Sequence, residues 1–171
     1  MRRKKNILYP DRYEESAYSV DYSLLYADGV RGLIFDIDNT IVPDNALADD
    51  RVITLFRRLE KMGFKLCIVS NNQQRRVEPF AIATGSVYIC DAAKPNVRGY
   101  KRAIRLMRMP RKKIVAIGDQ IFTDVVGANL AGIYSILVKP LDPDERFHIR
   151  LKRLLERVII RRYLKKTVES L

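Results

Sequence analysis

The sequence predicts an α/β protein in which a parallel sheet of about five strands is covered by helices on both faces. Short apolar runs rich in β-branched residues alternate with segments in which apolar residues recur every three or four positions, a pattern typical of βαβ units. A length of 171 residues fits one domain, and 47% hydrophobic residues are enough for a packed core. Together these observations favour three layers, with the sheet in the middle.

Five segments carry the strand pattern, and helical segments separate them. The predicted strands are residues 32–37, 64–70, 86–90, 113–118 and 134–139. Between the first two, apolar residues at helical spacing over 52–62 predict a helix that stops at Gly63. Two further helices are predicted over 95–107, which opens with a proline, and over 123–131, which Gly132 closes.

Polar side chains follow four of the predicted strands, at the points where those strands end. They are Asp36 and Asp38 after the first strand, Ser70 and Asn71 after the second, Lys94 downstream of the third, and Asp119 and Asp124 after the fourth. Each cluster alone is common as turn or cap chemistry. Because parallel strands point their carboxyl ends to one edge of the sheet, where ligands bind, we expect the four clusters to form one site.

These residue types suit the handling of a phosphate group. Ser70 could donate a hydrogen bond to a phosphoryl oxygen, and Lys94, at a helix amino terminus, could neutralise phosphate charge. Asp119 and Asp124 add oxygen ligands for a hard cation. With a divalent cation, the two carboxylates that follow the first strand suit phosphoryl transfer.

The ordered set resembles the four motifs of the haloacid dehalogenase superfamily, and the resemblance covers about residues 31–140. It implies a three-layer Rossmann-like fold, a nucleophilic aspartate, a second aspartate as acid and base, and one Mg²⁺ ion. Within the superfamily, dehalogenases lack the second aspartate and transport ATPases carry threonine there. Asp38 therefore favours a phosphatase.

The expected chemistry gives each residue a role. Asp36 is the expected nucleophile, which divides phosphate ester hydrolysis into formation and breakdown of an acyl phosphate. Asp38 is expected to protonate the leaving oxygen and then to draw a proton from water, provided that its surroundings raise its pKa. The expected phosphate-binding residues are Ser70, Asn71 and Lys94. The expected Mg²⁺ ligands are Asp36, Asp38 through its main-chain carbonyl as the resemblance implies, Asp119, and Asp124 either directly or as support for the other ligands.

The spacing of the motifs predicts a site without a cap domain. In the superfamily, caps are inserted between the first and second motifs or between the second and third. Here 34 residues separate Asp36 from Ser70 and 24 separate Ser70 from Lys94, and one helix and one strand fill each gap. An open site gives little enclosure to a small metabolite and suits a phosphate carried on something large.

A narrower resemblance concerns the substrate. The compact form of residues 36–40, the Leu8-Tyr9-Pro10 start and the short length resemble the YqeG-type proteins, which are capless subfamily IIIA phosphatases. These are similar to the mitochondrial-type phosphatidylglycerophosphatases. The resemblance implies a phosphate on an anionic lipid head group as substrate.

Two segments are expected to flank the catalytic domain of residues 31–140. Residues 1–30 contain several tyrosines and are expected to form an arm that packs on the body, although such an arm could instead bind a partner. Residues 141–171 are expected to form a basic amphipathic helix, with its regular pattern over 146–166. Its apolar stripe consists of Leu151, Leu154, Leu155, Val158, Ile159 and Tyr163.

Three accounts remain open for the basic helix. Its stripe could pack on the sheet, with the charges simply solvated. It could bind an anionic membrane surface, to which each Lys or Arg near the lipids contributes about 1 kcal/mol. It could bind RNA, and a second basic patch over 98–113 is consistent with phosphate-rich partners of either kind.

Charge and hydropathy limit the location of the protein. The chain has a net charge of +12, and its apolar runs are far shorter than the roughly 20 residues of a transmembrane helix. The basic residues near position 1 are not followed by the apolar region of a secretory signal. We expect a cytoplasmic protein that can lie on the inner face of the membrane.

The leading hypothesis is a Mg²⁺-dependent phosphomonoester hydrolase that acts on a lipid-linked or other large phosphate, such as phosphatidylglycerophosphate. The alternative is a non-catalytic protein on the same scaffold that binds RNA or the ribosome through its basic helices. Nucleic acid is the less favoured partner, because no RNA-recognition motif accompanies the basic patches and no residue of the catalytic set is missing.

Overall fold

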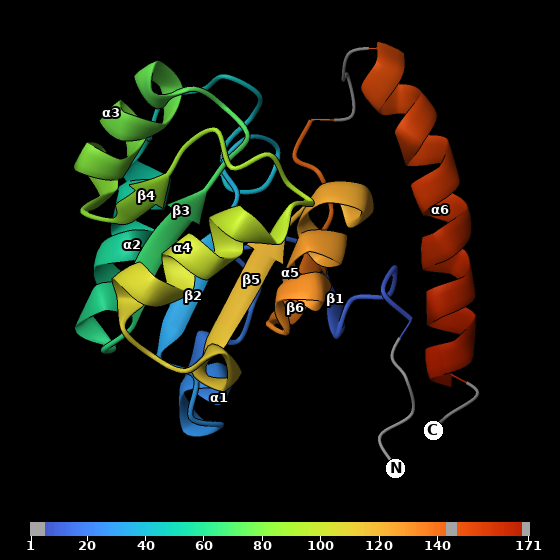
Figure 1. Cartoon of the computed structure of the whole chain (residues 1–171), viewed down its shortest axis with the longest axis horizontal. Coiled ribbons are helices and arrows are strands. Elements are labelled where there is room, and N and C mark those ends of the chain that lie inside the picture. Colours follow the sequence, from blue (N-terminus) through green and yellow to red (C-terminus); the bar gives the residue numbers. More distant parts are fainter. Residues whose placement is uncertain (1–5, 143–146, 169–171) are drawn as a thin grey trace.

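Six parallel strands form one sheet in the computed structural model, which describes residues 6–142 and 147–168 (Figure 1). The strands are β1 (Arg12–Glu14), β2 (Gly32–Phe35), β3 (Lys65–Val69), β4 (Val87–Ile89), β5 (Ile114–Gly118) and β6 (Tyr134–Val138). Their order across the sheet is β1-β6-β5-β2-β3-β4, and all neighbouring pairs are parallel. The parallel sheet is confirmed: the five predicted strands are β2 to β6, and β1 is an addition.

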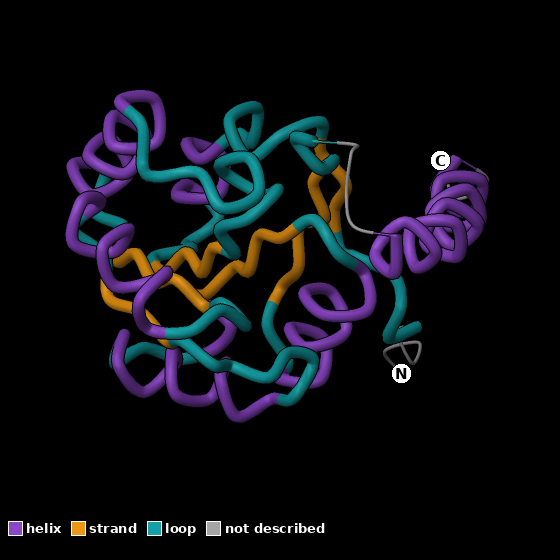
Figure 2. The backbone as a smooth tube through the Cα atoms, turned by 90° about the horizontal axis from the view of Figure 1, so that it is seen from above, coloured by secondary structure: helices purple, strands orange, loops and turns teal. Residues whose placement is uncertain are grey.

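Helices cover both faces of the sheet (Figure 2). The helices on the faces are α1 (Tyr22–Ala27), α2 (Asp50–Lys61), α3 (Gln74–Thr84), α4 (Val97–Met107) and α5 (Val126–Ala131), and α6 (Phe147–Val168) lies along one side of the molecule. Because side chains alternate along a strand, β2 sends Leu33 and Phe35 into a core with α1, α2 and α3, and Ile34 into a second core with α4 and α5. The described stretch between Asp36 and Lys94 holds no inserted domain, as the spacing predicted.

Helix ends lie close to the predicted positions because capping residues fix them. The side chain of Asp49 accepts a hydrogen bond of 2.8 Å from the Val52 N–H, which begins α2. Gly63 and Gly132 have φ values of +94° and +72°, in the left-handed region that glycine adopts most easily, and they follow α2 and α5. The predicted helix over 123–131 is α5 preceded by a π-helical turn at Ile121–Val125.

The amino-terminal segment adds β1 and α1, neither of which the sequence predicted. β1 pairs with the edge of β6, so that Arg12 lies opposite Ile136. The strand has three half-buried residues, and so short a segment carries no apolar run and no alternation to detect. Tyr26 packs edge-to-face on Phe64, with ring centroids 5.4 Å apart. The described part of the predicted arm thus contacts the body, and residues 1–5 lie outside the described residues.

Helix α6 divides the predicted apolar stripe between two faces. Ile159 and Ile160 pack against a small cluster of Ile121, Val125 and Leu137. Leu154, Leu155 and Val158, in contrast, are 55%, 58% and 47% exposed, so the account in which the stripe packs on the sheet does not hold for these three. Polar residues that bond to the body occupy the inward positions of this part of the helix. Arg146 and the side chain of Leu151 lie outside the described residues.

Within the described residues, no helix combines the length and the apolar character that crossing a membrane requires.

Candidate active site

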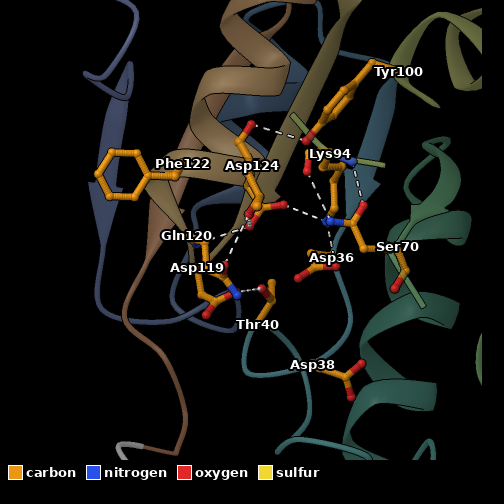
Figure 3. Close-up of polar contacts among 12 residues, drawn as sticks. Asp36, Asp38, Thr40, Ser70, Lys94, Tyr100, Asp119, Gln120, Phe122 and Asp124 are labelled. Carbon is orange, nitrogen blue, oxygen red and sulfur yellow. Dashed lines mark hydrogen bonds and ion pairs between the residues drawn. The ribbon is translucent and has the colours of Figure 1, made fainter. Parts of the chain in front are cut away.

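The sheet order brings the four predicted clusters together at the carboxyl ends of the central strands (Figure 3). Phe35, the last residue of β2, lies opposite Ile68 of β3 on one side and Ile117 of β5 on the other. Asp36, the first residue after β2, therefore lies beside the carboxyl ends of both β3 and β5. The chain runs from β2 outward in one direction through β3 and β4, and in the other through β5 and β6. The site thus lies at the switch point where α/β sheets bind ligands.

Lys94 lies at the centre of the site, between two carboxylates. Its Nζ donates hydrogen bonds of 2.7 Å to Asp36 Oδ1 and 2.7 Å to Asp124 Oδ1, and its side chain is only 3% exposed. Burial alone would lower the pKa of Lys94, but the charges of Asp124 and Asp36 raise it above the ordinary value. The lysine is therefore a buried, protonated cation that fixes both carboxylates.

Three acidic side chains at the site lie close enough to one another to bind one metal ion together. Carboxylate oxygens of Asp36, Asp119 and Asp124 lie within 4.8 Å of one another. Burial raises the pKa of Asp36 to about 6, against the opposing effect of Lys94. Burial also raises the pKa of Asp119 to about 8, against the opposing charge of an arginine, Arg153. Such a set of carboxylate oxygens fits a hard divalent cation, so this cluster could hold a metal ion.

Local packing fixes the acids that follow β5. A Cβ atom on Gly118 would lie 2.4 Å from Asp124 Cγ, so only glycine at this position lets Asp124 approach the strand. The Gln120 N–H donates to Asp124 Oδ2 at 3.1 Å. Asp119 is 2% exposed, and its Oδ1 accepts a hydrogen bond of 2.9 Å from the hydroxyl of Thr40.

Asp38 lies apart from the three acids, at the rim of the site (Figure 3). Arg76 Nη2 lies 2.8 Å from Asp38 Oδ1 in an ion pair, and Asn72 Nδ2 donates to Asp38 Oδ2 at 2.5 Å. The main-chain N–H of Asn45 donates to Asp38 Oδ1 at 2.8 Å. The side chain of Asp38, the predicted acid and base, is therefore held by α3, by the loop that precedes α3 and by the loop that follows β2.

Ser70 and Asn71 both lie next to the loop that carries Lys94. Ser70 is buried, and its Oγ accepts a hydrogen bond of 3.1 Å from the Asn72 N–H. Asn71 Oδ1 accepts a hydrogen bond of 2.6 Å from the Lys94 main-chain N–H, and Asn71 Nδ2 donates to the Lys94 carbonyl at 3.2 Å. In this structure the Asn71 amide thus fixes the main chain of Lys94.

Helix α6 contributes two residues that sequence reasoning did not assign to the site. Arg153 pairs with the Asp119 carboxylate through Nη2 and donates to the Asp119 carbonyl at 2.6 Å through Nη1. Glu156 Oε1 accepts the main-chain N–H groups of Ile121 and Phe122 at 2.7 and 3.3 Å. One signal was available, because Glu156 is the only acidic residue in the basic run 146–166. Nothing in the sequence distinguishes Arg153 from the cations around it.

Arg76 and Asn72, which hold Asp38, were also missed as site residues. An arginine on an expected helix and an asparagine in a loop have no pattern that relates them to a carboxylate more than 30 residues earlier.

The acidic cluster and the buried lysine at the end of the parallel sheet form a candidate active site. Residues 43–132 match the haloacid dehalogenase-like hydrolase family, and this span is more than half of the chain. The protein belongs to that family. The matched span begins after Asp36 and Asp38 and includes the three later clusters.

Similarity to individual proteins indicates which kind of hydrolase this is. The chain is 37% identical over 157 residues to "Probable phosphatase YqeG" of Bacillus subtilis (strain 168), and the match covers 91% of each protein. It is 26% identical over 168 residues to "Phosphatidylglycerophosphate phosphatase 1, chloroplastic/mitochondrial" of Arabidopsis thaliana, covering 86% of this chain and 45% of that protein. The chain therefore spans about half the length of the plant protein. With these relatives, the protein is a phosphatase of the haloacid dehalogenase family.

A solved structure supports the fold alone. The crystal structure of an uncharacterized protein from Listeria monocytogenes serotype 4b matches with a TM-score of 0.55 at 18% identity, over 69% of this chain and 85% of that one.

Proposed function

We propose that the protein is a Mg²⁺-dependent phosphomonoester hydrolase that forms a phosphoryl intermediate on Asp36 and acts on a phosphate carried by a lipid, such as phosphatidylglycerophosphate. The observation that carries this proposal is the pair of 2.7 Å hydrogen bonds by which Lys94 fixes Asp36 beside two further carboxylates at the switch point of the sheet. A nucleophile held this way is ready to meet an incoming phosphorus atom.

In the first step, the free carboxylate oxygen of Asp36 attacks phosphorus, and the bond from phosphorus to the ester oxygen breaks. The leaving oxygen takes a proton from Asp38, which enters this step protonated. Asp38 must therefore leave its contacts with Arg76 and Asn72 to reach the leaving group. Lys94, which stays protonated, offsets the negative charge that gathers on the phosphoryl oxygens.

In the second step, Asp38 takes a proton from a water molecule, whose oxygen attacks phosphorus. The bond between phosphorus and the Asp36 oxygen breaks, which releases inorganic phosphate and restores the Asp36 carboxylate. Ser70 and the second N–H of Asn71, which both follow β3 directly, are the proposed donors to the phosphoryl oxygens.

Asp36, Asp119 and Asp124 are the proposed side-chain ligands of Mg²⁺, with the carbonyl of Asp38 as a further ligand. When bound, the cation supplies charge neutralisation between the Asp36 carboxylate and a dianionic phosphate. The residues themselves fit this role, since their oxygens already lie within 4.8 Å of one another.

The proposed substrate class follows from what surrounds the site. No domain is inserted between β2 and β4 to enclose a small molecule, so specificity must come from the surface around the site. The similarity to phosphatidylglycerophosphate phosphatases of a plant and an alga supports a lipid-linked phosphate, although the chain covers only 45% and 58% of their lengths.

Hydrolysis of an aryl phosphate by the purified protein tests the mechanism. Activity should require Mg²⁺, and Asp36→Asn should abolish it, because an amide cannot form the acyl phosphate. Asp44→Asn, an exposed aspartate in the following loop, is the matched control and should keep full activity. Turnover that survives Asp36→Asn would refute the mechanism. A panel of phosphatidylglycerophosphate, small sugar phosphates and nucleic-acid ends then tests the substrate class.

A further inference from the structure

Helix α6 presents two faces of opposite character. Its inner face holds Glu156, which is 3% exposed, together with Ile159 and Ile160, which pack on the body. Tyr163 also lies inward, with its ring edge-to-face against Tyr9 at 5.7 Å. Figure 2 shows α6 along one side of the molecule, with its other flank turned away from the sheet. This helix is therefore attached along one face only.

The outer face carries large apolar side chains that the body does not cover. Leu154, Leu155 and Val158 are 55%, 58% and 47% exposed, and Leu164 in a later turn is 43% exposed. At 3.6 residues per turn, Leu154 and Val158 lie on the side of the helix opposite Glu156, and Leu155 lies on the flank next to Val158. A surface helix normally turns its leucines toward the core. Here the polar residues Arg153 and Glu156 take inward positions and the leucines point outward.

Cations accompany the exposed leucines. The exposed basic residues beside them are Arg157, Arg161, Arg162 and Lys165, whereas Lys166 places its Nζ over the Tyr9 ring on the inner side, 5.8 Å from the ring centroid. Among the described side chains of α6, the only acid is Glu156, and it is turned inward. The outer face thus combines apolar surface with positive charge, and none of the described side chains on it is acidic.

We propose that the outer face of α6 is a docking surface for an anionic phospholipid bilayer. Leucine and valine side chains would enter the region between head groups and acyl chains, while the cations contact lipid phosphates. A nucleic acid would use the cations but not the leucines, because single strands are bound through aromatic stacking. A second copy of the chain would bring two cationic faces together, which charge repulsion disfavours.

The inner face ties this surface to the active site. Arg153 contacts Asp119 of the acidic cluster, and Leu154 and Leu155 follow directly in the helix. A bilayer held by these leucines would therefore lie close to the end of the sheet that carries Asp36. Membrane docking by α6 stands independently of catalysis, whereas its consequence, the presentation of a lipid-borne phosphate to the site, rests on the proposed function.

Vesicle flotation with the full chain tests the proposal. Vesicles of phosphatidylcholine that contain phosphatidylglycerol should carry the protein, and vesicles of phosphatidylcholine alone should not. The double variant Leu154→Gln/Leu155→Gln should bind at least about tenfold more weakly, because two apolar side chains no longer enter the bilayer. Arg161→Gln/Arg162→Gln should also weaken binding, and added salt should weaken binding of the unchanged protein. Leu106→Gln, on α4 with a similar exposure of 53%, is the matched control and should bind like the unchanged protein.

Measurements of stability, hydrolysis and RNA binding show how the flotation result is to be interpreted. The leucine variants should keep the melting temperature and the hydrolysis of a soluble aryl phosphate, which separates lost docking from lost folding. Absence of flotation with phosphatidylglycerol vesicles, or equal flotation of the Leu154→Gln/Leu155→Gln variant, would overturn the proposal. Binding of RNA in place of vesicles, unaffected by the leucine substitutions, would overturn it in favour of nucleic acid. If flotation behaves as expected but the aryl phosphate is not hydrolysed, docking stands and the proposed function fails.

Discussion

Asp36 and Asp38 are two residues apart in the chain, yet the centre and the rim of the site hold them by different means. At the centre, the buried Lys94 bridges Asp36, which follows β2, and Asp124, which lies in the π-helical turn after β5. At the rim, Asp38 is held by Arg76 of α3 and by Asn72 of the preceding loop. The position of the proposed nucleophile is thus set by the protein core, and that of the proposed acid and base by the periphery. Substitutions at the centre should affect both stability and activity, and those at the rim chiefly activity.

The largest expected effect that tests this comparison comes from Lys94→Met. Methionine leaves the Asp36 and Asp124 carboxylates buried without their shared cation, which should lower the free energy of unfolding by about 3–5 kcal/mol. Aryl phosphate hydrolysis should fall by at least about a hundredfold, since the charge that opposes the phosphoryl oxygens is lost. Urea unfolding and steady-state kinetics measure the two effects.

Lys101→Met provides the control for this prediction. Lys101 is exposed on α4, so its loss should change the free energy of unfolding by less than about 0.5 kcal/mol. If Lys94→Met proves as stable as this control, the centre does not depend on the bridging lysine.

At the rim, Asp38→Asn should lower kcat by about 10²–10⁴-fold, the usual contribution of an acid and base. An alkyl phosphate should lose more activity than an aryl phosphate, because its poorer leaving group depends more on protonation. The free energy of unfolding should fall by less than for Lys94→Met, because asparagine keeps an acceptor for the Asn45 N–H and loses only the charge opposite Arg76, whose side chain is 14% exposed. An equal loss with both esters would argue against proton transfer by Asp38.

A further effect is expected on the pH dependence of stability without metal. Folding raises the pKa of Asp36 to about 6 and of Asp119 to about 8, mainly through burial, so the folded protein binds protons more tightly there than the unfolded chain does. Stability should therefore rise as the pH falls from about 8 to about 5, where both folded carboxyl groups are protonated.

Thermal melting from pH 8 to pH 5 measures this trend. Mg²⁺ should stabilise the protein most at the upper end, where it meets ionised carboxylates, and thereby flatten the trend. Asp119→Asn should weaken the slope in the absence of metal. A metal-free melting temperature that rises steadily with pH would contradict the assignment of buried, proton-binding acids to the centre.

Most of the sheet could be predicted from the sequence, because β2, β3, β5 and β6 are apolar runs that end in turn residues. Asp36, Ser70 and Asp119 could be placed at one edge because each directly follows such a strand, and parallel strands share an edge. β1 could not be predicted, since three half-buried residues carry no pattern of their own.

The contacts among the site residues depend on tertiary structure that no local pattern records. The bridge from Lys94 to both Asp36 and Asp124 requires the loop after β4 to cross the ends of two other strands. The inward position of Arg153 depends on its pairing with Asp119, a contact that the apolar periodicity of this helix does not indicate. The roles of these residues in catalysis remain predictions that the substitutions above test.

The short strand β1 also affects how molecules of this protein meet one another. The strand β6, with buried apolar residues on most of its length, would otherwise present unpaired main-chain groups along the side of the sheet. Such a margin invites a strand from a neighbouring chain to add to it, which is a common route to aggregation. β1 occupies this position with only three residues, and Arg12 and Glu14 place a charge pair there. The segment that was hardest to recognise in the sequence thus protects the sheet against self-association.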